Sequence, residues 1–531
     1  YNADPTGKTD ATAAIQKALD DHCLGDNWTL YLPNGTYLLS GTLDWGNGSR
    51  MGPVLQGQSR DGTILRLKDQ APGFGNPGAP KAIIHIVQKG SADAFCMAVR
   101  NLTIDTGSGN PGASGLQFMA NNQGAVRDVT IRSGDGRGVV GLDLAFTDMI
   151  GPCLVKNVEV RGFDIGIATG WEVASMTFEH IRLSGQRKFG FLNAGQCVSI
   201  RGLVSDNEVP AVVNKAGTSF LVLVDSVLTG TKNAENMPAI VNDAHCFLRN
   251  VRTPGYGRAL ESSVGTFASG GKPDEIEEFV SLAPIHLFPT LKHSLGLPVR
   301  ETPEVAWGDP KDWANVQNFG ADTRDDLDDT EAIQKAIDSG AKTVYFPHPL
   351  PAGKEQTKLP RGSYRINGTV RIRGNVERII GGGGYWWMLS VGGEARDGVF
   401  ILEEGTAPVV IIEDFNIVDG GAAPVFRHRS GRTLVMRHVN SIMHHSLYHG
   451  DDGAGPAFFE DVASHFPIGG KDRSGGAPNF HFGKGQKIWA RQFNPEKNIT
   501  KILNDGADFW VLGLKTEVLA TLLENRPGAR T

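Results

Sequence analysis

Cysteine is scarce in this 531-residue chain, which has five cysteines and no CxxC pair. An odd number without paired spacing argues against a disulfide framework and against a structural zinc site. Positive charge is not in excess either, because 52 basic residues against 58 acidic ones give a formal net charge of −6. A nucleic-acid binder needs a basic face, so we expect no nucleic-acid partner. No apolar run reaches the ~18 residues of a membrane-spanning helix, so we expect no membrane partner.

Glycine and proline, by contrast, are abundant. The 68 glycines and 28 prolines make up about 18% of the chain, against ~12% in average proteins, and indicate many turns. The 40% of hydrophobic residues are enough for a large core.

One pattern occurs twice, once in each half of the chain. Residues 10–20 (DATAAIQKALD) return as residues 328–338 (DDTEAIQKAID). Each copy is followed by a short apolar strand that ends in proline, at residues 30–33 and 344–347, and then by a Gly-x-Tyr triplet. The threonine is a good helix start, and the apolar residues lie four apart on one helix face. We therefore predict that each half of the chain begins with a short helix that caps its core.

A shorter period fills the rest of both halves. Apolar triplets recur at steps of mostly 21 to 29 residues, and many are preceded by a polar residue. A period near 22–24 residues with short strands and Gly/Asn turns predicts parallel β-helices, whose rungs stack at ~4.8 Å. In the first half these preceding residues are Asn101, Asp128, Asn157, His180, Ser226 and Asn250, and in the second half we expect Asp414, His438 and Asp461 to form a polar ladder.

The repeat fades between the two halves, where Gly, Pro and Ser become frequent. The predicted fold is all-β, with two tandem right-handed parallel β-helices, each with a short N-terminal capping helix. The predicted domains are an N-terminal β-helix at 1–255, a linker at 256–314 and a C-terminal β-helix at 315–531.

The capped helix followed by the apolar-Pro strand resembles the start of pectate-lyase-superfamily β-helices. Its duplication resembles the twin β-helix of glycoside hydrolase family 55, whose known members are exo-acting β-1,3-glucanases. The closing segments 488–496, 503–506 and 510–517, the last ending in Lys-Thr-Glu, are similar to bacterial relatives of that group. The resemblance implies an inverting glycosidase for a neutral polysaccharide.

By this resemblance Glu517 is the general acid. It follows a predicted buried strand, and Glu496 lies one rung earlier. Two carboxylates at equivalent positions of adjacent rungs would lie ~5 Å apart, and burial or such a neighbour would raise one pKa, as an acid requires. Because the family inverts, we interpret Glu496 as a modulator or substrate contact rather than a nucleophile. The family is thought to position its water with Gln and Ser side chains, and Gln196 and Ser219, spaced by one rung, are the candidates here.

Further residues are candidates for substrate contact. Tyr385, Trp386 and Trp387 follow four glycines, and aromatic rings stack on sugars. Asp451 and Asp452 lie in a Gly-rich loop and are candidates to bind sugar hydroxyls. The remaining candidates belong to the closing segments: Trp489, Arg491 and Lys515.

We expect no metal and no cofactor. Five histidines lie between residues 444 and 481, but only His445 and His449 are four apart, and no helix is predicted there.

Three functions remain open on the sequence. The first is exo-β-1,3-glucan hydrolysis with inversion. The second is a polysaccharide lyase on a uronic-acid polymer, for which Arg427, Arg429, Arg432 and Arg437 form the local basic cluster. The third is a non-catalytic carbohydrate-binding β-helix. In each case the partner is a polysaccharide or oligosaccharide. We expect a monomer that is secreted or periplasmic, its signal peptide already removed.

Overall fold

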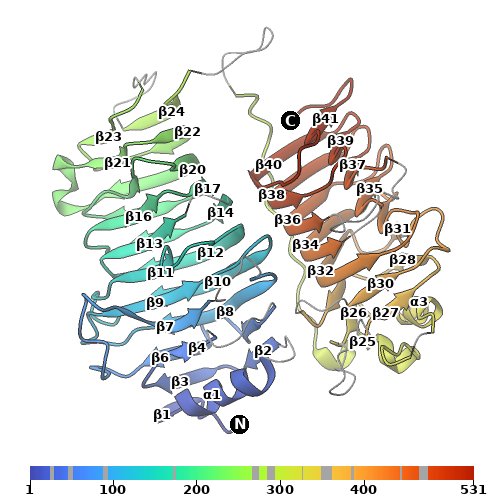
Figure 1. Cartoon of the computed structure of the whole chain (residues 1–531), viewed down its shortest axis with the longest axis horizontal. Helices are drawn as coiled ribbons and strands as arrows, with labels where there is room; N and C mark the ends of the chain where they lie inside the picture. Colours follow the sequence, from blue (N-terminus) through green and yellow to red (C-terminus); the bar gives the residue numbers. More distant parts are fainter. Residues whose placement is uncertain are drawn as a thin grey trace. The chain divides into compact units, whose positions relative to one another are not determined.

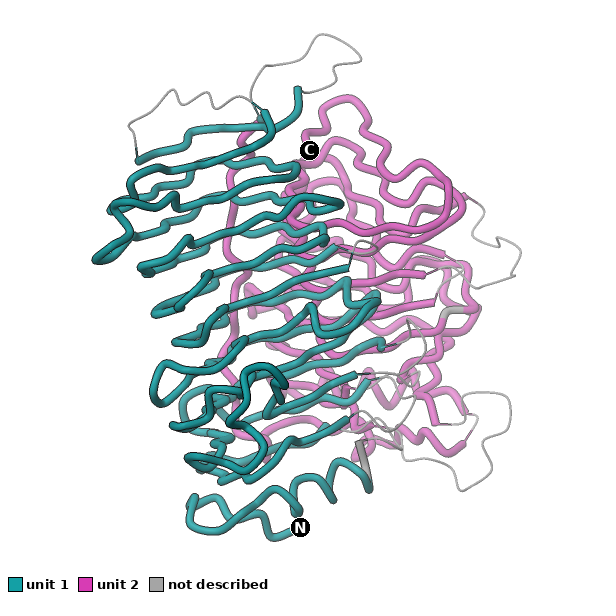
Figure 2. The backbone as a smooth tube through the Cα atoms, turned by 60° about the vertical axis from the view of Figure 1, so that its left-hand side comes forward, with its two compact units in different colours: residues 1–294 teal, residues 295–531 magenta. Residues whose placement is uncertain are grey.

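The computed structural model describes residues 1–23, 29–45, 52–87, 94–171, 175–265, 274–283, 294–325, 327–348, 362–383, 388–442, 445–465 and 476–531. The chain divides into two compact units, Tyr1–Ser294 and Leu295–Thr531. In each unit, short strands of successive turns lie beside one another (Figure 1), and the backbone trace coils through them (Figure 2). Among the described residues, no helix combines the length and apolarity needed to cross a membrane.

Unit 1 contains two sheets, and their pairings are parallel except for the antiparallel pair of the last strand with β22. The larger sheet comprises β1 (Thr6–Asp10), β2 (Thr29–Leu32), β3 (Gly35–Leu39), β5 (Val54–Gly57), β6 (Thr63–Leu67), β8 (Met97–Asp105), β10 (Gly124–Arg132), β12 (Cys153–Arg161), β14 (Ser175–Glu179), β15 (Arg182–Ser184), β17 (Cys197–Arg201), β18 (Val204–Asn207), β20 (Phe220–Gly230), β22 (His245–Arg252) and β24 (Glu275–Val280). The smaller comprises β4 (Leu43–Asp44), β7 (Lys81–Ile86), β9 (Ala113–Phe118), β11 (Val140–Leu144), β13 (Ile165–Gly170), β16 (Phe189–Ala194), β19 (Val212–Asn214), β21 (Pro238–Asn242) and β23 (Arg258–Ser262).

Unit 2 repeats this plan with parallel pairings throughout its named strands. Its larger sheet comprises β25 (Ala314–Asn315), β26 (Thr343–Phe346), β27 (Tyr364–Ile366), β29 (Arg378–Gly381), β30 (Leu389–Val391), β32 (Val409–Asp419), β34 (Thr433–Ile442), β36 (Ala457–His465), β38 (Lys487–Pro495) and β40 (Asp508–Leu514). Its smaller sheet comprises β28 (Val370–Gly374), β31 (Phe400–Gly405), β33 (Phe426–His428), β35 (Tyr448–Gly450), β37 (Phe480–Phe482), β39 (Ile502–Asn504) and β41 (Leu523–Asn525). The prediction of parallel β-helices is confirmed.

The predicted capping helices are present as α1 (Thr12–Ala18) and α3 (Thr330–Asp338). In both helices the glutamine of the repeated motif hydrogen-bonds the backbone of a nearby strand. The Gln16 side chain accepts from the backbone N–H of Asp44 at 2.8 Å and donates to its carbonyl at 2.9 Å. Gln334 bonds the backbone of Arg371 in the same way. Asp44 and Arg371 lie in β4 and β28, the first strands of the two smaller sheets. Each glutamine therefore hydrogen-bonds backbone groups at a sheet edge that no further strand covers.

The ladder residues adopt a left-handed backbone conformation, with φ between 48° and 70°. This conformation turns the chain sharply between the two parts of each long strand, and Asn, Asp and Gly tolerate it best. The row contains Asn101, Asp128, Asn157, His180, Gly202, Asp225 and Asn250 in unit 1 and Asp414, His438, Asp461, Gln492 and Gly513 in unit 2. The ladder predicted for Asp414, His438 and Asp461 is therefore confirmed, and unit 1 has an equivalent row in which Asp225, not Ser226, occupies the corner. Ser226 pairs with Val251, one residue further along its strand.

Residues 295–309, here named the strap, are extended and lie along the outer face of the larger sheet of unit 2. Its residues contact one rung after another. The Pro298 carbonyl accepts from Trp489 Nε1 at 2.9 Å, Thr302 bonds Glu460, and the Val305 carbonyl accepts from Arg378 at 2.9 Å. The predicted linker region at 256–314 thus holds two strands of unit 1, β23 and β24, and a segment packed on unit 2.

Replacing a ladder residue tests the backbone requirement. Asn157 has φ 54° and donates from Nδ2 to Asp128 Oδ1 at 3.0 Å. We expect Asn157→Val to lower the free energy of unfolding by ~1–3 kcal/mol, because a β-branched residue is strained at positive φ. Asn157→Gly keeps the conformation and loses only the side-chain hydrogen bond, so it should cost less. Urea denaturation followed by circular dichroism measures both, and equal losses would contradict the strain argument.

Candidate functional site

The loop that follows β40 presents Glu517 to solvent. Its side chain is 59% exposed, and Oε1 lies 2.5 Å from Lys515 Nζ. Lys501 holds the loop from beneath, donating to the carbonyl oxygens of Glu517 and Val518, both at 2.6 Å. Val518 has φ 68°, which is a strained conformation for a β-branched residue. Strain held in place by a buried lysine is typical of functional loops rather than ordinary turns.

Glu496, one rung earlier, is buried beside Lys515. Lys515 Nζ contacts Glu496 as well as Glu517, and His465 Nδ1 lies 2.9 Å from Glu496 Oε2. Burial raises the pKa of Glu496, but the hydrogen bond and charge of His465 and the Lys515 ammonium outweigh it, and the pKa falls to about 2. Glu496 is therefore ionised at neutral pH and is not a proton donor. Glu496 and Glu517 thus share Lys515 as a partner, but Glu496 is buried whereas Glu517 is exposed.

The structure does not place Gln196 and Ser219 where a water-holding pair would lie. Both are buried, at 0% and 1% exposure. Gln196 Nε2 donates to the carbonyls of Ile150 and Gly170, both at 3.0 Å, and the Ser219 hydroxyl accepts from the backbone N–H of Gly195 at 2.7 Å. Their polar atoms satisfy turn backbone inside unit 1. Neither side chain is available to position a water, because a polar residue before a strand serves the turn equally well.

Trp489 and Arg491 are not available for contact with a saccharide either. Trp489 stacks on Phe458, with ring centroids 4.8 Å apart, and donates to the strap at Pro298. Arg491 is fully buried and donates to the strap carbonyl of Arg300 at 2.6 Å. The strap occupies both residues, and the repeat pattern gave no signal for it, because an extended segment without strand partners has no periodicity.

The remaining predicted contacts have mixed outcomes. Asp451 is half-buried and accepts from Arg427 Nε at 2.8 Å, whereas Asp452 is exposed and accepts from the backbone N–H of Lys484 at 2.8 Å. Both lie in the loop after β35, and Asp452 keeps oxygen capacity for a sugar hydroxyl. Tyr385, Trp386 and Trp387 lie outside the described residues.

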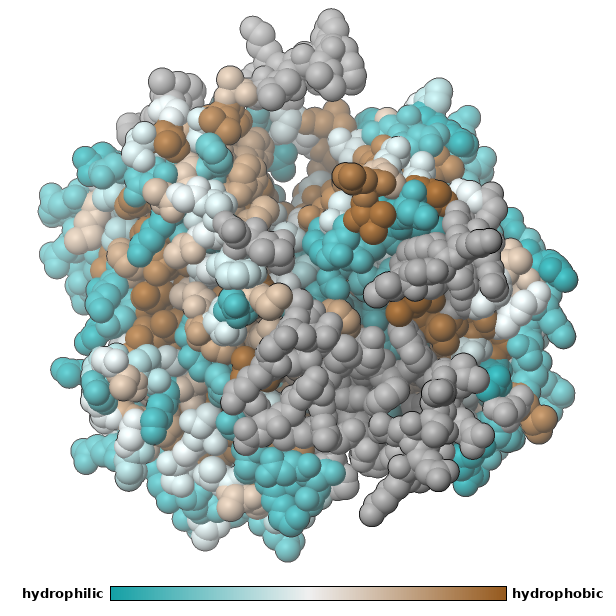
Figure 3. All heavy atoms as spheres, in the orientation of Figure 1, coloured by the Kyte–Doolittle hydropathy of each residue, from teal (hydrophilic) through white to brown (hydrophobic). Residues whose placement is uncertain are grey.

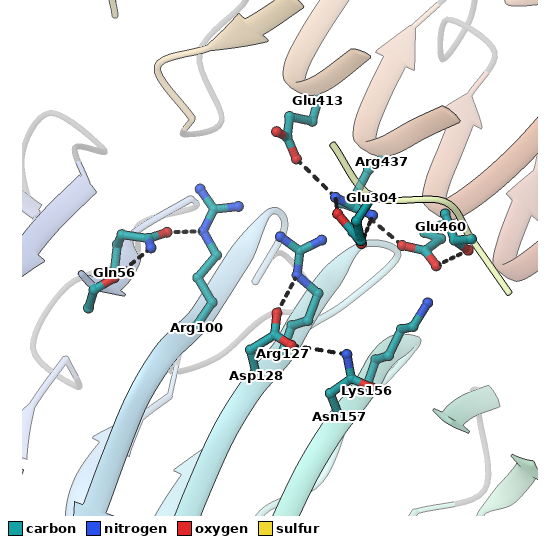
Figure 4. Close-up of polar contacts among 12 residues, drawn as sticks. Gln56, Arg100, Arg127, Asp128, Lys156, Asn157, Glu304, Glu413, Arg437 and Glu460 are labelled. Atoms are coloured by element: carbon teal, nitrogen blue, oxygen red, sulfur yellow. Dashed lines mark hydrogen bonds and ion pairs between the residues drawn. The ribbon is translucent and has the colours of Figure 1, made fainter. Parts of the chain in front are cut away.

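The arginine cluster proposed for a lyase is dispersed. Arg427 and Arg429 pair with Asp397. Arg432 is buried and donates to the backbone carbonyls of Ala407 and Val376, each at 2.6 Å. Arg437 is buried between Glu413, Glu460 and the strap residue Glu304, as Figure 4 shows. These partners make the four arginines structural in unit 2.

Unit 1 has a polar pocket that the sequence did not indicate. It encloses about 320 Å³ beside the polar ladder. A Cβ atom at Gly202 would lie 3.0 Å from His180 Nδ1, so the missing side chain in the ladder leaves room for the imidazole. The residues that line the pocket include Arg60, Asp128, Asn157, Glu159, His180 and Arg182. Arg60 is bound to Thr130 and Glu159, whereas the exposed Arg182 makes no ion pair with any described residue.

Cations also follow one another along the larger sheet of unit 1. Arg100, Arg127 and Lys156 occupy equivalent positions on β8, β10 and β12. Figure 4 shows Arg100 directed to Gln56 and Arg127 to Asp128. Lys156 and Arg201 flank the buried carboxylate of Glu179, at 3.4 and 2.7 Å. The sheet register thus brings together cations that belong to different rungs and are distant in sequence.

The Glu496 ion pairs predict a pH-dependent contribution to stability. The folded-state pKa of about 2 lies below the ordinary 4.5, so the stabilisation is complete above pH 4.5 and is lost as the pH falls towards 2. We expect Glu496→Gln to lower the free energy of unfolding at pH 7 by up to ~3 kcal/mol. The matched control is Glu524→Gln, which removes an exposed carboxylate in β41 and should cost ~0–1 kcal/mol. A difference between Glu496→Gln and wild type that persists unchanged at pH 2 would contradict the assignment.

Comparison with known proteins agrees with this architecture. Residues 1–222 match a family described as rhamnogalacturonase A/epimerase, pectate lyase-like. No curated protein matches the chain.

Three solved structures illustrate the likeness, each at low sequence identity. The mannuronan C-5 epimerase A-module of Azotobacter vinelandii shares 11% identity, over 100% of this chain and 97% of that one, with a TM-score of 0.23. The GH87 α-1,3-glucanase catalytic unit of Streptomyces thermodiastaticus shares 9%, over 100% and 68%, with a TM-score of 0.26. The tailspike of E. coli bacteriophage HK620 shares 9%, over 99% and 77%, with a TM-score of 0.31. At these scores the likeness carries no information about activity. Residues 1–222 therefore resemble the pectate-lyase-like family, and the stacked parallel sheets show a β-helix fold in both units.

Proposed function

We propose that the protein is a carbohydrate-active enzyme, a glycoside hydrolase that removes sugar units from the chain end of a neutral β-1,3-glucan with inversion. The observation that carries the proposal is the Glu517 loop. The exposed Glu517 carboxylate lies beside Lys515, on a strained backbone whose carbonyl oxygens are bound by the buried Lys501, and the neighbouring Glu496 is ionised at neutral pH. A pair of neighbouring carboxyl groups is the usual equipment of glycosidases.

The division of roles follows from the surroundings. Glu517 is the solvent-accessible group and is assigned the general acid, which protonates the glycosidic oxygen as the bond breaks. Glu496 stays ionised and stabilises the positive charge that develops on the sugar ring. Lys515 lies between the two carboxylates, so its release from Glu517 leaves the Glu496–Lys515 pair intact. On the visible face of the molecule, hydrophilic and hydrophobic side chains are interspersed (Figure 3). Such a mixed surface is compatible with the proposal, because a neutral sugar does not require a basic groove.

Replacement of Glu517 by glutamine tests the proposal. Because a positioned acid contributes ~10²–10⁴-fold, Glu517→Gln should lower kcat on β-1,3-glucan by that factor while thermal stability stays unchanged. A nitrophenyl glycoside, whose leaving group needs less protonation, should lose less. Reducing-sugar release over a panel of neutral and acidic polysaccharides measures the first and nitrophenol release the second, with Glu524→Gln as the control. A variant with wild-type turnover would remove Glu517 from the mechanism.

The anomeric form of the first product separates the two possible roles of Glu496. Inversion is expected, and proton NMR of fresh product reads it directly. Retention would instead make Glu496 the nucleophile, since a retaining pair lies ~5–5.5 Å apart.

A second function, action on a uronic-acid polymer, is favoured by the pocket of unit 1. Arg60 and Arg182 line it, and it lies within the residues that match the rhamnogalacturonase/epimerase family. Guanidinium groups bind carboxylates well. If this function is correct, wild-type protein should depolymerise or epimerise a polyuronate, and Arg182→Gln should raise KM at least ~10-fold. An unchanged polyuronate after incubation with wild-type protein would exclude it.

A further inference from the structure

The outer face of the smaller sheet of unit 2 carries two histidines on neighbouring rungs. His449 in β35 and His481 in β37 are directly paired in register. Their chain neighbours Tyr448 and Phe480 point into the core, so the alternation of a strand directs both imidazoles outwards. The side chains are 28% and 20% exposed, so they are sheltered but accessible.

The two imidazoles face one another through the same atom. His449 Nδ1 and His481 Nδ1 lie 3.0 Å apart, and the rings are nearly perpendicular, at 84°. Two nitrogen lone pairs at this distance repel unless a proton or a metal ion lies between them. A single proton would be held as an Nδ1–H···Nδ1 hydrogen bond, which requires one ring to carry its proton on Nδ1.

A carboxylate lies on the far side of each ring, at different distances. Asp451 Oδ1 lies 3.5 Å from His449 Nε2, whereas Asp505 Oδ2 lies 3.9 Å from His481 Nε2, beyond hydrogen-bonding distance. The Asp451 carboxylate favours the proton on Nε2 of His449 and leaves the Nδ1 lone pair of that ring available, as in metal-bound histidines. Asp451 is fixed for this role by Arg427 Nε at 2.8 Å.

The distance selects the class of metal. Two metal–nitrogen bonds of ~2.1 Å that meet at ~90° place their nitrogens ~3.0 Å apart, whereas a tetrahedral angle requires ~3.4 Å. Right-angled nitrogen coordination is typical of Cu(II) and Ni(II). We propose that His449 and His481 form a two-histidine chelate for a tetragonal divalent transition metal, with Asp451 orienting the His449 ring and water completing the coordination. This site is independent of the role proposed for Glu517.

Titration with Cu(II) tests the site on the full-length protein. The wild type should bind one ion more tightly than any site in His449→Gln or His481→Gln, each of which should lose affinity by at least ~10-fold in isothermal titration calorimetry. The matched control is His245→Gln, an exposed histidine of β22 in unit 1, which should leave the tight site unchanged. Electron paramagnetic resonance of the wild type should show two equatorial nitrogens, and one in each single variant.

A gain-of-function variant guards against loss through misfolding. Leu503 follows His481 in the same outward row, on β39. Leu503→His should add a third imidazole and tighten Cu(II) binding at least ~10-fold, with Ca(II) producing no effect because it prefers oxygen ligands. Equal Cu(II) affinity in wild type and the His449→Gln/His481→Gln double variant, or no gain from Leu503→His, would overturn the proposal.

Discussion

Parallel hydrogen bonding between successive rungs is the constraint on which the structure depends. Most strands pair with the equivalent strand of the next rung, 22 or 23 residues later in pairs such as β14–β17 and β34–β36, so equivalent residues form rows that run along the unit at ~4.8 Å spacing. The residues that stack along one row must therefore be compatible with one another. Apolar residues stack inside, ladder residues that accept positive φ form the corner, and charged residues on the outer rows need partners of opposite sign.

The outer rows of the two units meet that requirement differently. In unit 2, Glu413, Arg437 and Glu460 alternate in sign on consecutive rungs. From the strap, the Thr302 hydroxyl donates to Glu460 and the Glu304 carboxylate accepts from Arg437. In unit 1, cations occupy consecutive rungs before Glu179 intervenes. Like charges at this spacing repel, so such a row is stable only with anionic or polar neighbours such as Asp128 and Gln56.

The candidate functional side chains lie outside the hydrophobic cores. The interior is filled with apolar side chains, so Glu517, Asp452 and the His449–His481 pair all belong to loops or outward positions. The loops are nevertheless anchored: Lys501 binds three oxygens of the Thr516–Val518 segment. A rigid stack that carries short, pinned loops allows a few side chains to be placed accurately without altering the fold.

The sequence alone determined the architecture, because repeats, helix motifs and ladder residues are local signals that one strand or helix carries by itself. It also indicated the Glu496–Glu517 neighbourhood, since a spacing of one rung converts directly into a distance. Only the tertiary structure decided which polar groups remain available. Gln196 and Ser219 bond turn backbone, and Trp489 and Arg491 lie under the strap. The unit 1 pocket and the histidine pair arise from register and from one missing side chain at Gly202. These outcomes depend on partners distant in sequence, and a pattern read along the chain does not contain them.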